Sequence, residues 1–169
     1  MAKQSTKERS AGYSEILADI KSGNYSPYYL LMGEEPWYSD NIAAEITANA
    51  LTEDEKGFNY HLFYGGDCND VTVVEASRRF PMMASRQLVV LKEAQLLKNL
   101  DAFAAYFSQP MPSTILLIVF TGKSADKRGS FYKSALAGNG VVFESVALKD
   151  NQIPSWIENF ARSEGYNTD

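Results

Sequence analysis

Two patterns of apolar positions alternate along this sequence. Short apolar segments bounded by glycine, proline or polar residues are typical of β-strands. Where every residue of such a segment is apolar, the strand is expected to be buried on both faces. These segments are 28–32, 58–64, 87–92, 114–120 and 141–144. Between them, apolar residues recur three and four positions apart, which places them on one face of a helix. The helical segments are 13–20, 39–50, 70–80, 96–107 and 131–136.

Because strand and helix alternate, the sequence predicts an α/β fold, a parallel five-stranded sheet sandwiched by helices. Local signals mark several boundaries. Ser39 and Asp40 can cap the second helix, and the charged run 53–57 is expected to break it. Asp70 can cap the next helix, which Pro81 stops because proline lacks an amide hydrogen.

A second part of the chain is expected to begin near residue 148. The sequence turns polar there, and Pro154 can start a helix that carries Trp156. A helix of this length does not fold alone, so residues 148–169 are interpreted as the truncated beginning of a further, helical domain. The main domain is predicted over 1–147, with its polar residues 1–10 expected to be flexible.

Composition excludes several classes of function. The net charge of −5 disfavours a domain that binds nucleic acid through clustered Lys and Arg, so any DNA contact is expected to be indirect. The apolar runs are far shorter than the roughly 20 residues that cross a bilayer, and the polar start lacks a signal sequence. A cytoplasmic protein is expected. One cysteine, Cys68, and one histidine, His61, leave no disulfide, zinc site or catalytic triad.

Gly33 ends the first predicted strand, where an ATPase of this layout carries the phosphate-binding loop G-x-x-x-x-G-K-[ST]. In that alignment Tyr38 occupies the second glycine position, Ser39 the lysine position and Asp40 the position of the magnesium-binding hydroxyl. The acidic pair 34–35 would also repel a triphosphate. The sequence therefore predicts a degenerate nucleotide site, with no cofactor and no metal.

The third strand supports the same interpretation. ATPases of this type follow that strand with an acidic pair that manages magnesium and water, whereas Lys92 and Glu93 stand here. The segment 122–124, Gly-Lys-Ser, resembles half of a phosphate-binding loop, but Leu117, five positions before it, lies within a predicted strand. No hydrolysis is expected.

Apolar residues follow the proline break between the third helix and the third strand. Met82 and Met83 lie there between charged residues. Methionine is flexible and polarizable, so a neighbouring pair suits a pocket on another protein. The alternative is that both side chains close the bottom of this domain's own core.

Three stretches of the sequence resemble the delta subunit of bacterial DNA polymerase III. They are YYLLMGEEP at 28–36, FPMMASRQLVVLK at 80–92, and DKR at 126–128 with YK at 132–133. They occur in the family's order and span nearly the whole chain.

The resemblance implies an ATPase-like fold of the P-loop (AAA+) type that binds no nucleotide, in a clamp-loader subunit that opens the sliding-clamp ring during DNA replication. It places the apolar wedge that enters a pocket of the clamp on Met82 and Met83, flanked by Arg79, Phe80 and Pro81. It implies no enzymatic activity for this chain, although the family is part of a polymerase holoenzyme. Other loader subunits would join the full-length protein through a helical collar, after a small helical lid.

Two other functions stay open at this point: an ATP-binding P-loop-type NTPase, supported by the layout, Gly33 and 122–124, and a generic α/β scaffold. The segment 126–128 has no assigned role and is equally consistent with a solvated charged loop. His61 is interpreted as a packed or surface strand residue, and Cys68 as a loop thiol.

Overall fold

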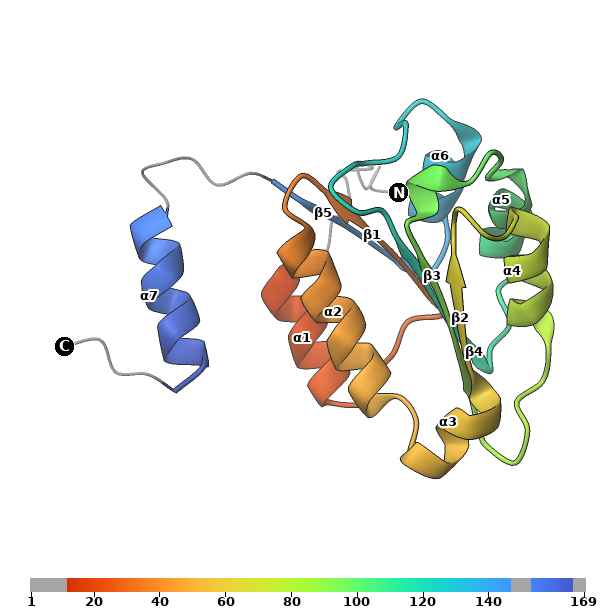
Figure 1. Cartoon of the computed structure of the whole chain (residues 1–169), viewed down its shortest axis with the longest axis horizontal. Helices are drawn as coiled ribbons and strands as arrows, with labels where there is room; N and C mark the ends of the chain where they lie inside the picture. The colour runs from red at the N-terminus through yellow and green to blue at the C-terminus, as the bar shows by residue number, and fades with distance from the viewer. Residues whose placement is uncertain (1–11, 147–152, 166–169) are drawn as a thin grey trace, which may run out of the picture.

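Five parallel strands form the centre of the molecule (Figure 1), which this computed structural model describes over residues 12–146 and 153–165. The strands are β1 (Tyr28–Gly33), β2 (Tyr60–Tyr64), β3 (Gln87–Lys92), β4 (Thr114–Val119) and β5 (Val141–Ser145). They lie in the order β2-β3-β4-β1-β5, and every neighbouring pair is parallel. The predicted parallel five-stranded sheet is confirmed.

Helices cover both faces of this sheet (Figure 1). The helices are α1 (Tyr13–Lys21) and α2 (Pro36–Asn49) on one face, and α4 (Asp70–Arg78), α5 (Asp101–Ser108) and α6 (Ser130–Ala137) on the other. Two short elements, α3 (Glu53–Asn59) and the 3-10 turn η1 (Ala94–Leu96), precede β2 and follow β3. The described ranges contain no helix with the length and hydropathy of a membrane span.

The helix expected near Pro154 is present as α7 (Ile153–Ser163). The predicted flexible residues 1–10 and the predicted domain boundary at 148 lie outside the described residues. The division into two domains therefore stays a prediction.

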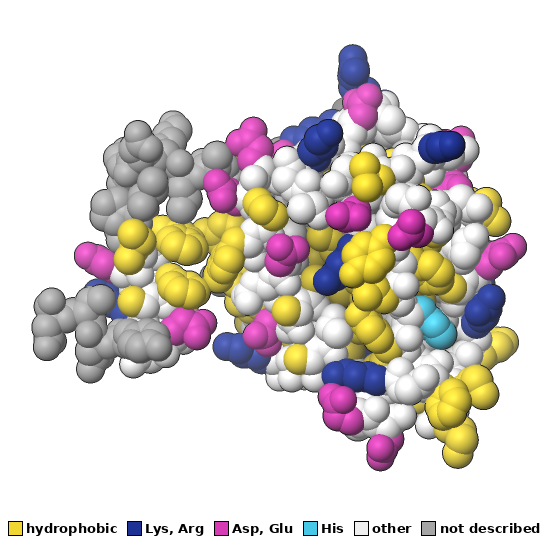
Figure 2. Space-filling model, in the orientation of Figure 1, with side chains coloured by type: hydrophobic (Ala, Val, Ile, Leu, Met, Phe, Trp, Pro, Cys, Tyr) yellow, Lys and Arg dark blue, Asp and Glu magenta, His cyan; other side chains and the backbone are white. Residues whose placement is uncertain are grey.

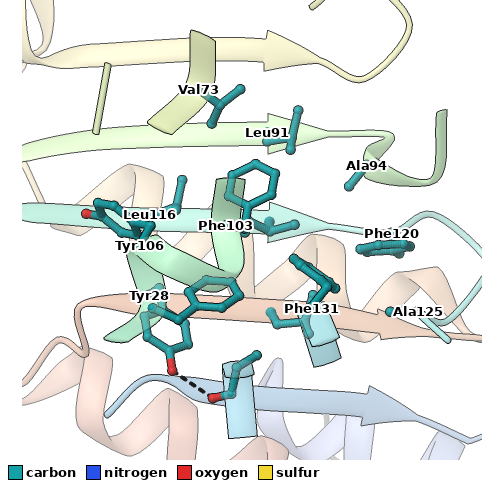
Figure 3. Packing of buried hydrophobic residues seen from close by; sticks show 14 of the residues in the cluster. Tyr28, Val73, Leu91, Ala94, Phe103, Tyr106, Leu116, Phe120, Ala125 and Phe131 are labelled. Carbon is teal, nitrogen blue, oxygen red and sulfur yellow. Dashed lines mark hydrogen bonds between the residues drawn. The ribbon is translucent and has the colours of Figure 1, made fainter. Parts of the chain in front are cut away.

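β1, an interior strand between β4 and β5, buries side chains on both faces. Tyr29 and Leu31 pack in the layer of α1 and α2, whereas Tyr28 and Leu30 pack in the layer of α4, α5 and α6. Burial on both faces is the reason that every position of the strand is apolar. Figure 3 shows the second layer, which is rich in aromatic rings; the Tyr28 hydroxyl there donates a hydrogen bond to the Ala135 carbonyl oxygen at 2.7 Å.

The edge strand β2 is covered less than the others. On the face of α1 and α2 these helices lie over β1, β4 and β5, and Leu62 and Tyr64 remain 39% and 42% exposed. Figure 2 accordingly shows apolar side chains at the surface between α2 and β2. Partial burial agrees with the alternating pattern of this strand, which differs from the continuous runs of the central strands.

The predicted start of the second helix is wrong by three residues. α2 begins at Pro36, where proline replaces an amide that would have no helical partner. Ser39 is therefore inside the helix; it is 1% exposed, and its hydroxyl points to the Met32 carbonyl oxygen at 3.5 Å. Asp40 is exposed on the first turns.

α2 ends at Asn49, before the run 53–57 as predicted, but this run is itself helical and forms most of α3. Thr52 caps the helix: its hydroxyl accepts from the Glu55 amide at 3.3 Å, and its own amide donates to the Glu55 carboxylate at 2.9 Å. This reciprocal pair is a capping box, whose T-x-x-E spacing stands in the sequence. As a result Phe58 and Asn59 are helical, and the strand predicted from 58 begins at Tyr60.

Two further helix ends differ from prediction. α4 ends at Arg78, two residues early, and its cap is Asn69, whose side chain accepts from the Thr72 amide at 2.9 Å. Asp70 instead accepts from the Ala102 amide at 3.0 Å, so it caps α5 from a distance. The helix predicted from 96 is divided into η1 and α5.

Candidate functional site

The α4–β3 loop, residues 79–86, carries the predicted wedge. It lies where the parallel strands begin, at the edge of the sheet opposite the degenerate nucleotide site. Phe80, Met82 and Met83 are 79%, 59% and 99% exposed. The expected exposure of the methionines is confirmed, and the alternative in which both close the core is wrong. Figure 2 shows apolar side chains gathering at this corner, beside α3.

Asn59 holds the backbone of this loop in place. The Met82 amide donates to Asn59 Oδ1 at 2.6 Å, and Asn59 Nδ2 donates to the Met82 carbonyl oxygen at 2.8 Å and to the Glu55 carbonyl oxygen at 2.9 Å. Asn59 is 1% exposed, so these hydrogen bonds are shielded from water. The backbone of Met82 is fixed while its side chain stays in solvent.

The two ends of the loop are joined by Gln87. Its buried side-chain amide donates to the carbonyl oxygens of Ala76 and Arg79 at 2.9 and 2.8 Å and to Thr114 Oγ1 at 2.9 Å. The Thr114 hydroxyl in turn donates to the Ser77 carbonyl oxygen at 2.6 Å. These contacts satisfy the last carbonyl groups of α4 and tie them to β3 and β4.

Local backbone geometry turns the loop outward. Met83 has a φ of 54°, in the left-handed region that costs a side-chain-bearing residue about 1–2 kcal/mol. Pro81, two residues earlier, has a restricted φ of its own. At the far end, the Arg86 guanidinium lies over the Tyr25 ring, 4.9 Å from its centroid. The loop is therefore held on both sides of the methionines.

Arg79 contributes a positive charge beside the apolar side chains. It is exposed and follows the last residue of α4. Burial, and then the charge of Arg79, lower the pKa of His61 below its ordinary value. His61 is thus a partly buried residue of β2, as predicted from the sequence.

The degenerate nucleotide site lies at the other edge, where the strands end. Only Glu34 and Glu35 separate Gly33 at the end of β1 from Pro36 at the start of α2. The Gly33 amide donates to the Lys123 carbonyl oxygen at 2.9 Å. A phosphate-binding loop needs several free amide groups in a wide turn, whereas this turn is short and one of its amides is already bonded.

Ser145 of β5 closes this turn further. Its hydroxyl accepts from the Glu35 amide at 3.1 Å and donates to the Glu35 carbonyl oxygen at 2.9 Å. A Cβ atom on Gly33, whose φ is 122°, would come within 2.3 Å of the Ser145 backbone. Glycine is required here for this close contact.

The other predicted positions of the degenerate site lie along the same edge. Lys92 and Glu93 are exposed after β3, and Glu93 adopts a left-handed φ of 53° at the start of η1. The segment 122–124 lies in the loop after β4, and Leu117 is within that strand as predicted.

Aromatic rings pack next to this turn. Tyr38 is half-buried against Trp37 and Tyr13, with centroids 5.1 and 5.0 Å apart. Trp37 contacts Trp156 and Phe160 of α7 at 5.6 and 5.4 Å. The rings of Trp156 and Phe160 stack on each other at 5.4 Å. The first turn of α2 thus connects the sheet to α7, a role that the sequence did not reveal.

The described residues contain no cluster of His, Cys, Asp and Glu that could hold a metal ion. The Cys68 thiol donates to the Tyr64 carbonyl oxygen at 3.1 Å, and burial together with Asp67 raises its pKa. A raised pKa is the opposite of what a reactive thiol needs.

In the segment 126–128, the Asp126 side chain accepts a hydrogen bond from the Arg128 amide, and Lys127 forms an ion pair with Glu144 at 3.0 Å.

Comparison with known proteins gives a consistent result. A sequence model of the family described as "DNA polymerase III, delta subunit" matches residues 29–145. The chain is 24% identical over 161 residues to the DNA polymerase III subunit delta of Bacillus subtilis, covering 89% of this chain and 46% of that protein. The chain spans about half the length of the relatives it matches.

Solved structures share the fold. The Bacillus subtilis DNA clamp loader delta protein matches with a TM-score of 0.77 at 22% identity, over 90% of this chain and 48% of the other. A Thermotoga maritima protein related to the DNA polymerase III gamma subunit matches with a TM-score of 0.53 at 11% identity, over 85% and 49%. At these identities the likeness concerns the fold alone, a sheet between helices as predicted.

Proposed function

Since the chain belongs to the family of DNA polymerase III delta subunits, we propose that it binds the sliding clamp through the α4–β3 loop and stabilises the opened ring during DNA replication. The observation that carries this proposal is the exposure of Met82 and Met83 on a loop whose backbone is held by Asn59 and Gln87. Arg79, Phe80 and Pro81 complete the contact.

The free energy of burying apolar side chains favours a hydrophobic pocket of the clamp as the binding site for the two methionines. Burying a methionine side chain contributes about 1.5–3 kcal/mol, so the pair can anchor an interface. A chain that binds the open ring more tightly than the closed ring shifts the clamp toward the open form. The chain supplies this difference in affinity and no catalytic group, while other loader subunits supply the work of ATP hydrolysis.

The remaining partners follow from the same proposal. The full-length protein joins other clamp-loader subunits, and α7 begins the helical domain that leads to them. Contact with DNA is indirect, through the complex, in the cytoplasm. The net charge of −5 supports this, since direct phosphate binding needs clustered cations.

The test is the affinity of the chain for its cognate clamp, measured by surface plasmon resonance. The double variant Met82→Ser/Met83→Ser should bind roughly a hundredfold more weakly or worse, because two apolar side chains lose their burial. Both residues are exposed, so the melting temperature should stay near that of the wild type.

A matched control removes two exposed apolar side chains elsewhere. Val71 on α4 and Leu96 on η1 are 51% and 55% exposed, at the edge of the sheet where the strands end. Val71→Ser/Leu96→Ser should bind the clamp like the wild type. Equal binding by the wild type and the methionine variant would contradict the proposed site.

A further inference from the structure

We propose that α3 forms the second half of the clamp-binding face, with Phe58 as a third apolar anchor and Asn59 as the positioning residue that fixes the methionines relative to it. This inference rests on the proposed function. It concerns a segment more than twenty positions before the methionines, joined to their loop by contacts within the folded domain.

Phe58 extends the exposed apolar surface of the α4–β3 loop. It is 66% exposed and directly precedes Asn59, whose side chain bonds to the Met82 backbone at both the amide and the carbonyl oxygen. Phe58 is therefore brought, through its neighbour Asn59, to the same corner of the domain as the loop that carries Phe80, Met82 and Met83. Figure 2 shows apolar side chains continuing over this corner.

An exposed cluster of large apolar side chains needs an explanation. Single exposed apolar residues are common, but contiguous groups mark sites of interaction. The occupant is the clamp pocket, because the same corner carries the methionine pair assigned to that pocket. Aromatic residues contribute strongly at interface centres, so Phe58 should add affinity of its own.

Asn59 acts through the loop backbone. Because Asn59 makes two hydrogen bonds to Met82, the loop is held in one arrangement before the clamp binds. Less conformational entropy is therefore lost on binding. Its third bond, to the Glu55 carbonyl oxygen, anchors the amide to α3 itself. The backbone of α3 is thereby held at a fixed position relative to the backbone of Met82.

The experiment compares clamp affinities of single and combined variants by surface plasmon resonance. Phe58→Ser should weaken binding about fivefold or more, and Asn59→Ala about tenfold. Asn59→Asp keeps the acceptor for the Met82 amide and should lie between Asn59→Ala and the wild type. Val71→Ser, an exposed apolar residue distant from the loop, should change affinity less than twofold.

Combined variants distinguish the positioning role of Asn59 from the direct contact proposed for Phe58. In a Met82→Ser background, the effect of Asn59→Ala should shrink, since Asn59 acts through Met82, whereas that of Phe58→Ser should persist. Hydrogen exchange at the Met82 amide should accelerate in Asn59→Ala and stay at the wild-type rate in Phe58→Ser. If Asn59 only stabilised the domain as a whole, its effect on clamp affinity would be as large in the Met82→Ser background as in the wild type.

The outcomes are distinguishable from failure of the proposed function. If the wild type does not bind the clamp, both proposals fall. If the wild type binds and Met82→Ser/Met83→Ser does not, but Phe58→Ser and Asn59→Ala bind like the wild type, only this inference is overturned. Phe58 is exposed, so its variant keeps the test decisive even if Asn59→Ala folds poorly.

Discussion

Two small polar side chains each hold the backbone of one residue in a distant segment. Asn59 bonds to both the amide and the carbonyl oxygen of Met82, and Ser145 does the same to Glu35. A backbone held at both groups cannot rotate without losing two hydrogen bonds, each contributing about 0.5–1.5 kcal/mol. The Asn59 contact holds a loop whose side chains face solvent, and the Ser145 contact closes the turn between β1 and α2.

The histidine provides a test of the electrostatics beside the wedge. The pKa of His61 is lowered by burial and by Arg79, so Arg79→Gln should raise this pKa toward its ordinary value of 6.5. NMR titration is unambiguous because the chain has a single histidine. Arg78→Gln is the control, since the Arg78 guanidinium lies over the Tyr106 ring. An unchanged His61 pKa in Arg79→Gln would contradict the assignment.

The sign of the pH dependence follows from this shift. Below the unfolded pKa the unfolded chain binds a proton at His61 more readily than the folded chain does. The contribution of His61 to stability is therefore fully present above pH 6.5 and decreases as the pH falls below it. Urea unfolding at several pH values should show a smaller decrease in the Arg79→Gln variant.

Among the secondary-structure elements, the junction of β1 and α2 forms the predicted degenerate nucleotide site. The start of a helix is normally an anion site because its first amides are free. Here Pro36 has no amide hydrogen, the Gly33 amide is bonded to Lys123, and the Glu35 amide is bonded to Ser145. The two intervening residues, Glu34 and Glu35, add negative charge.

Fluorescent ATP should therefore fail to bind this chain. Titration with magnesium present is expected to give no saturable signal in the micromolar range, because the turn offers no phosphate cradle and repels anions. A functional P-loop ATPase measured under the same conditions is the positive control. Saturable, magnesium-dependent binding would instead support the nucleotide-binding alternative.

Over the whole molecule, aromatic packing connects the sheet domain to α7. Trp37 from the first turn of α2 contacts both Trp156 and Phe160 of α7, close to the closed turn. Each such ring pair contributes about 0.5–1.5 kcal/mol beyond burial. Packing between side chains thus holds α7 against the first turn of α2.

Intrinsic fluorescence can measure this connection, since the chain's two tryptophans both lie in it. Trp37→Ser should weaken the docking of α7 by about 1–3 kcal/mol, because two ring pairs are lost. The remaining Trp156 emission should then shift to longer wavelength as the ring gains water contact. Ile157→Ser, at a residue of α7 that is 52% exposed, is the control. Unchanged Trp156 emission in Trp37→Ser would contradict this docking.

Much of the fold followed from the sequence alone. Continuous apolar runs indicated buried parallel strands because each central strand is covered on both faces, and helical spacing indicated the layers between them. The substitutions at Tyr38, Ser39 and Asp40 and the apolar pair at 82–83 were equally visible. The helix 53–59 was missed because its charged residues were interpreted as a break, although the capping box at Thr52 was present.

Only the tertiary structure determined which of these distant segments contact one another. Periodicity and capping are properties of neighbouring positions, so they determine which segments become strands and helices. The bonds of Asn59 to Met82 and of Ser145 to Glu35, and the contact of Trp37 with α7, join residues far apart in the chain. Such contacts arise only when the sheet brings distant segments together, and no spacing along the sequence reports them.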